Sequence, residues 1–62
     1  MKKKEIKMLA QKIAKYEKII QSSSDKGEIR KAQEDIMKIT SGVDSLDDMV
    51  QIDEIVMTLL DN

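Results

Sequence analysis

The chain has no cysteine and no histidine among its 62 residues. Without cysteine there is no disulfide framework and no thiolate metal site, and without histidine the usual zinc ligand sets are also excluded. Histidine and cysteine are also the most frequent catalytic residues, so acid-base or nucleophilic catalysis would have to use Asp, Glu, Lys, Ser or Tyr. We therefore expect no metal, no cofactor and no enzyme activity from the chain acting alone.

Long apolar runs are missing as well, since none exceeds three residues. A membrane-spanning helix needs about 20 such residues, and the core of a signal peptide needs about 7 to 15. Nothing in the sequence indicates secretion. We expect a cytoplasmic protein.

Proline is absent, there are only two glycines, and Tyr16 is the sole aromatic residue. This composition disfavours a strand-rich fold, which is typically built from alternating aromatic and β-branched residues. The length predicts one small helical domain over residues 1–62. A core of this size rarely contributes more than about 3 to 5 kcal/mol, so a partner or a second copy would add useful stability.

A first amphipathic helix is predicted over residues 3–21. Its apolar residues recur at spacings of three and four, the period that keeps side chains on one helix face; they are Ile6, Leu9, Ile13, Tyr16 and Ile20, and Ala10 and Ala14 widen the stripe. Lysines occupy the opposite side: Lys4, Lys7, Lys12, Lys15 and Lys18. This is the most regular amphipathic pattern in the chain.

The serines at positions 22–24 should end that helix, because their hydroxyls compete for nearby backbone groups. Asp25 stands three residues before Glu28, the spacing of a capping box, and predicts a second helix over residues 26–41. Gly42 then provides a glycine of the kind that commonly ends a helix in the left-handed conformation.

A third helix is predicted over residues 46–61. Ser45 and Asp48 repeat the capping spacing, and Asp47 and Asp48 suit the positive end of the helix dipole. Asp44, Asp47 and Asp48 do not follow the ligand pattern of a calcium-binding loop, so we interpret them as capping carboxylates. No glycine-rich phosphate-binding loop is present.

Three helices of similar length with short connections predict an all-α protein, a small three-helix bundle with up-down-up topology. The alternative is a long helical hairpin in which the serines do not break the chain and two copies dimerise. The predicted core contains Ile6, Leu9, Ile13, Tyr16, Ile20, Ile29, Ala32, Ile36, Ile39, Leu46, Met49, Ile52, Val56, Leu59 and Leu60.

The apolar residues of the third helix spread over an arc of roughly 220°, against roughly 80° for most of those in the second. This helix is therefore either the hub of the bundle or carries a second apolar face for a partner. Asp53 falls inside the arc, where an unpaired buried carboxylate would be costly, so it should lie at the edge of the packed face or meet a cation or the Tyr16 hydroxyl. Val50, Ile55 and Met57 are the candidates for the outer surface.

Charge is divided unevenly along the chain. Residues 1–31 hold ten Lys/Arg and four Asp/Glu, a net charge of +6, and residues 32–62 hold one lysine and eight acids, a net charge of −7; together they give the overall −1. The simplest interpretation is that opposite charges guide helix pairing within the bundle or between two copies.

The sequence thus predicts a non-catalytic protein-interaction module, such as an adaptor, an inhibitor or a small assembly subunit, that binds another protein or a second copy of itself through Val50, Ile55 and Met57. The alternative is a nucleic-acid-binding accessory protein that uses Lys4, Lys7, Lys12, Lys15 and Lys18. An anionic membrane surface ranks below both as a partner.

Overall fold

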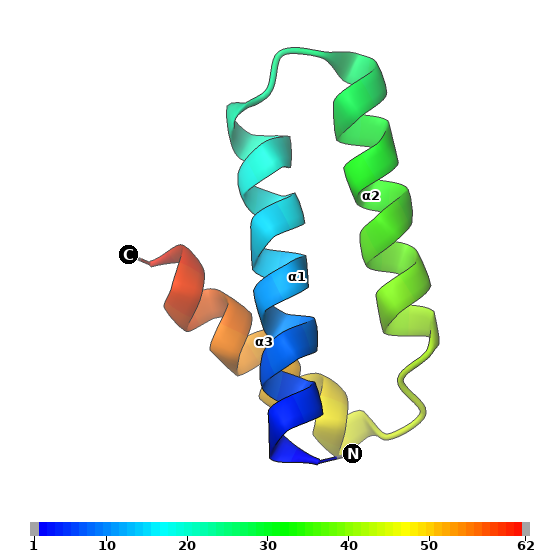
Figure 1. The fold of residues 1–62 in the computed structure, drawn as a ribbon, viewed down its shortest axis with the longest axis vertical. Coiled ribbons are helices and arrows are strands. Elements are labelled where there is room, and N and C mark those ends of the chain that lie inside the picture. The colour runs from blue at the N-terminus through cyan, green and yellow to red at the C-terminus, as the bar shows by residue number, and fades with distance from the viewer. Residues whose placement is uncertain (1, 62) are drawn as a thin grey trace.

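The computed structural model describes residues 2–61, and within them the chain forms three α-helices (Figure 1). They are α1 (Lys3–Ser22), α2 (Lys26–Ser41) and α3 (Leu46–Leu60). Each predicted boundary lies within one residue of the observed one. The protein is a small all-α three-helix bundle. The alternative, a long helical hairpin in which the serines do not break the chain, is wrong because residues 23–25 are not helical.

Side chains of the α1–α2 loop define where α2 begins. The Asp25 carboxylate accepts hydrogen bonds from the amides of Gly27 at 2.9 Å and Glu28 at 3.4 Å. The Asp25 amide itself donates to the Ser23 hydroxyl at 3.1 Å. The predicted N-cap, Asp25, is therefore confirmed. In a capping box the Asp25 amide would donate to the Glu28 carboxylate, whereas here it donates to Ser23.

The end of α2 differs from the prediction. Gly42 has φ −83° and ψ −4°, which is right-handed and not left-handed. Its amide donates to the carbonyl of Ile39 at 3.2 Å, and the amide of Val43 donates to the carbonyl of Thr40 at 3.1 Å. Tightened bonds of this kind satisfy the last carbonyls of a helix without any residue at positive φ.

The longest helix, α1, is the hub of the bundle. Both α2, which runs antiparallel beside it, and α3, which crosses it obliquely, pack against α1, whereas α2 and α3 scarcely touch one another (Figure 1). The interpretation of α3 as the hub is therefore wrong. The reason lies in Ala10 and Ala14, which are both buried and whose small side chains allow neighbouring helices to approach α1 closely.

The core lies mainly between α1 and α3. Its buried cluster consists of Ile6, Ala10, Ile13, Ala14, Ile52 and Val56, and Ala32 of α2 is also buried. Partly buried side chains that pack against the cluster are Leu9, Ile36, Ile39, Val43, Ile55, Leu59 and Leu60. The other predicted core residues except Leu46 are partly buried: Tyr16, Ile20, Ile29 and Met49.

Leu46 was assigned to the core and is instead 79% exposed. It is the first residue of α3, and around the helix it lies about 80° from Val56 and about 120° from Ile52, outside the packed face. α3 crosses α1 obliquely (Figure 1), and its residues in or against the core are Ile52, Ile55, Val56, Leu59 and Leu60. The remainder of its wide apolar arc faces outward.

Candidate protein-interaction surface

The position of α3 along the chain is set by its first turn. The Ser45 hydroxyl accepts a hydrogen bond from the Asp48 amide at 3.4 Å, which confirms Ser45 as the N-cap. Asp47 and Asp48 follow in the first turn, where carboxylates interact favourably with the helix dipole. The helix then continues to Leu60, and the Asp61 amide closes it on the carbonyl of Met57 at 3.1 Å.

The inner face of α3 packs into the core. Ile52 and Val56 are buried, and Ile55, Leu59 and Leu60 pack around them. At 3.6 residues per turn, these five residues lie on one side of the helix. Ile55 and Leu59 keep part of their surface exposed at the edges of this face.

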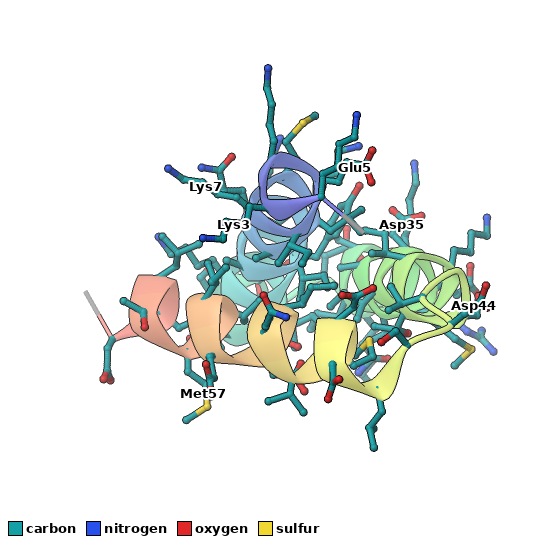
Figure 2. All side chains as sticks on the ribbon, turned by 90° about the horizontal axis from the view of Figure 1, so that it is seen from below. Lys3, Glu5, Lys7, Asp35, Asp44 and Met57 are labelled. Carbon is teal, nitrogen blue, oxygen red and sulfur yellow. The ribbon has the colours of Figure 1, made fainter. Side chains whose placement is uncertain are left out.

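The outer face of α3 carries three large apolar side chains in the solvent. Leu46 is 79%, Val50 49% and Met57 69% exposed, and Figure 2 shows Met57 pointing away from α1 on the far side of α3. Exposed Asp53 lies between Val50 and Met57 on the same face. We refer to Leu46, Val50, Asp53 and Met57 as the α3 outer stripe.

The outward positions expected for Val50 and Met57 are thus confirmed, but Ile55 lies differently. Ile55 is partly buried and packs against the core. Its remaining surface lines a shallow hollow of about 280 Å³ with Glu54, Thr58 and Leu59. Ile55 therefore belongs to the edge of the packed face and is separate from the α3 outer stripe.

Acidic side chains lie within the α3 outer stripe and along one flank of it. Asp47, Asp53 and Glu54 are exposed, as is Asp61 just beyond the helix. No lysine or arginine occurs in α3. Asp53 lies outside the packed face and is exposed, as the sequence predicted. The α3 outer stripe and its acidic neighbours together form a surface that is both apolar and negatively charged.

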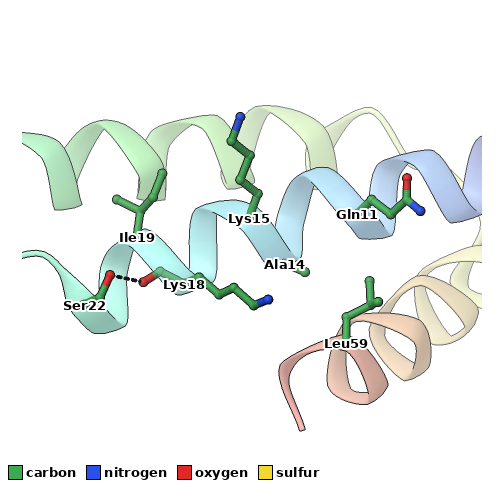
Figure 3. A pocket seen from close by; sticks show the side chains of 7 residues that line it. All are labelled: Gln11, Ala14, Lys15, Lys18, Ile19, Ser22 and Leu59. Carbon is green, nitrogen blue, oxygen red and sulfur yellow. Dashed lines mark hydrogen bonds between the residues drawn. The ribbon is translucent and has the colours of Figure 1, made fainter. Parts of the chain in front are cut away.

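A groove of about 430 Å³ runs between α1 and the last turns of α3 (Figure 3). Ala14 of α1 and Leu59 of α3 point toward one another across it, and Lys18 lies along its rim. The Ser22 hydroxyl donates to the Lys18 carbonyl at 2.7 Å and so is engaged within α1. A second hollow, of about 310 Å³, lies between α1 and α2 and is lined in part by Tyr16 and Ala32. Both hollows open to solvent.

The lysines of the alternative prediction lie together on the outside of α1. All five of them, Lys4, Lys7, Lys12, Lys15 and Lys18, are exposed. Met8 is half exposed among them and is the only large apolar residue on this side of α1. In Figure 2 Lys7 extends from α1 on the side of the molecule opposite Met57. Lys15 and Lys18, in contrast, line the groove that Leu59 of α3 also lines, so this end of the basic face borders α3.

Within residues 2–61 no three acidic side chains gather closely enough to hold a metal ion. In the same part of the chain no helix is both long and apolar enough to cross a membrane.

Leu46 is the one residue of the outer stripe that the sequence reasoning placed elsewhere. It was grouped with the core on hydrophobicity alone. The signal that could have found it is the spacing of Leu46, Val50, Asp53 and Met57, which places all four on one side of a helix.

Comparison with protein families, with characterised proteins and with solved structures finds no match to this chain.

Proposed function

We propose that this protein is a cytoplasmic, non-catalytic interaction module that binds another protein through the α3 outer stripe. One observation carries the proposal: three large apolar side chains are exposed on a helix whose inner face is already filled by the core. A contiguous apolar surface on a small protein is a common mark of a binding surface. The protein acts as an adaptor, an inhibitor or a small assembly subunit.

Binding fits this architecture better than catalysis does. The hollows on the described surface are open to solvent, whereas small-molecule sites bury most of their ligand. The exposed aspartates of α3 are distributed along a convex helix and do not converge on one point. Such a surface offers contact area and charge to a macromolecule.

Site-specific photo-crosslinking in the cells that produce the protein tests the proposal. A diazirine amino acid at Val50 or at Met57 should give a defined crosslinked product with one protein. Met37 of α2 is the matched control, because it is 68% exposed and Met57 is 69% exposed. Identical products from positions 37 and 57, or none from positions 50 and 57, would refute this function.

The exposed lysine face of α1 supports a second candidate function, a nucleic-acid-binding accessory protein. Exposed lysines along one helix can follow a phosphate backbone. Tyr16 is the only aromatic residue available for base stacking, which makes this candidate weaker.

Titration of labelled duplex and single strands at two salt concentrations separates the candidates, since phosphate-driven binding weakens steeply with salt. Lys12→Glu together with Lys15→Glu should abolish such binding, and Lys38→Glu on α2 is the control. Salt-sensitive binding with these properties would favour the second candidate, and no binding at low salt would eliminate it.

A further inference from the structure

The spacing of the α3 outer stripe indicates the shape of what covers it. Leu46, Val50, Asp53 and Met57 follow one another at intervals of four, three and four residues. This is the alternation of the d and a positions of a coiled coil, in which each side chain fits between side chains of a facing helix. The exposed side chains form a narrow line along the helix and not a broad flat patch. A single helix is the element that matches this line.

Asp53 occupies a central position in the line, with apolar residues before and after it. A carboxylate that is removed from water without a counter-charge is strongly unfavourable. A facing helix must therefore place a lysine or arginine against Asp53. The other acids beside the stripe, Asp47, Glu54 and Asp61, all lie on one flank of it and favour further cations along the matching edge of that helix.

A second copy of this chain does not supply such a helix. Its α2 carries exposed cations, but Met37 is the only large exposed apolar residue of that helix. Pairing of two α3 helices would bring two sets of carboxylates together with no cation from either helix. The lysine face of α1 has the right charge, but Met8 is its only large exposed apolar residue and cannot cover Leu46, Val50 and Met57 together. The complementary surface must come from a different protein.

We infer that the α3 outer stripe binds a basic amphipathic helix of another protein, with a lysine or arginine of that helix paired with Asp53. This inference rests on the proposed function and specifies the chemistry of the partner. The apolar side chains of the stripe provide burial, and Asp53 with the acidic flank selects against neutral and acidic helices.

Two synthetic peptides test the inference directly. Each spans about three heptads with leucine and isoleucine at a and d, except for one lysine at the central core position. One peptide has lysine at e and g, and the other has glutamate there. Fluorescence anisotropy of the labelled peptides with the intact chain should show binding of the lysine peptide, weakened by salt, and no binding of the glutamate peptide.

Variants locate the binding. Met57→Lys and Val50→Lys should each weaken the lysine peptide about tenfold or more, because both remove apolar contact and add repulsion. Met37→Lys, at equal exposure on α2, should leave the affinity unchanged. Asp53→Lys should also weaken binding, and a peptide whose central core lysine is replaced by glutamate should recover it.

Three results would overturn the inference: equal binding of both peptides, equal loss of binding with Met37→Lys and Met57→Lys, or no binding of either peptide. Sedimentation should find a monomer, and a dimer that Met57→Lys dissociates would identify a second copy as the occupant. If neither peptide binds while crosslinking from Val50 and Met57 still yields a defined product, the basic helix is wrong and the interaction function stands. If neither peptide binds and crosslinking gives no defined product, both the inference and the proposed function are wrong.

Discussion

Ala10 of α1 and Ile52 of α3 are both completely inaccessible to solvent and belong to one buried cluster. One is among the smallest side chains and the other is a bulky β-branched one. Their presence in one cluster indicates how the two helices pack: small side chains of α1 leave space, and larger side chains of α3 occupy it. The α1–α3 interface is therefore sensitive to added volume on the α1 side.

Ala10→Leu tests this packing. Extra volume in a filled core forces side chains and backbone to move, and we expect a loss of about 1 to 3 kcal/mol in the free energy of unfolding. Gln11→Leu, at the neighbouring exposed position, is the control and should change stability little. Urea unfolding followed by circular dichroism measures both. An Ala10→Leu variant as stable as the wild type would mean that α1 and α3 are not closely packed at this point.

Three substitutions in α3 should separate its inner face, its edge and its outer stripe. Val56→Asp buries an unpaired carboxylate and should unfold the domain. Ile55→Asp should destabilise it measurably, because Ile55 is partly buried against the core. Met57→Lys should leave the helical content and the unfolding midpoint nearly unchanged while it removes partner binding. Circular dichroism combined with the peptide titration reads out all three, and equal instability of the Met57 and Val56 variants would place Met57 in the core.

Gly42→Ala distinguishes the observed end of α2 from the expected one. An added Cβ would lie 3.5 Å from the Ile39 carbonyl oxygen, an ordinary contact, and the right-handed backbone accepts alanine without strain. Alanine also reduces the freedom of the unfolded chain, so we expect stabilisation by about 0.4 to 1 kcal/mol. Thermal unfolding measures the change. A destabilised variant would instead indicate a left-handed glycine at this position.

Asp25→Ala should weaken the start of α2. The substitution removes the acceptor for the amides of Gly27 and Glu28, and N-cap losses of this kind cost about 0.5 to 2 kcal/mol. Asp25→Asn keeps a capping oxygen and should retain most of the stability. Asp44→Ala, at an exposed loop position, is the second control. If Asp25→Ala is as stable as the wild type, the cap contributes nothing.

The sequence was sufficient to predict the three helices and their beginnings because these depend on local chemistry. Asp25 and Ser45 cap helices through hydrogen bonds to residues two or three positions away, and such bonds can be inferred from spacing alone. The apolar period likewise identified Ile52 and Val56 as inner residues and Val50 and Met57 as outer ones. The proposed roles of the outer residues stay predictions.

The errors concern properties that depend on how helices meet. Periodicity describes the faces of a helix but does not state which helix lies at the centre or at what angle another crosses it. The central place of α1 depends on the small volumes of Ala10 and Ala14, which hydrophobicity ranks below isoleucine and leucine. Leu46 was misplaced for the same reason, since only the crossing angle decides which part of a wide apolar arc meets a neighbour.

Because α2 and α3 scarcely touch, α2 is held almost entirely through one side of α1. Ala32 is its only buried residue among those described, and the main buried cluster contains no residue of α2. Local opening of a protein follows its weakest interface. We therefore expect the backbone amides of α2 to exchange with deuterium through partial detachment of this helix, at a lower free energy than those of α1, while the α1–α3 pair remains assembled. The α3 outer stripe, which is proposed to bind the partner, would therefore keep its shape while α2 opens and closes.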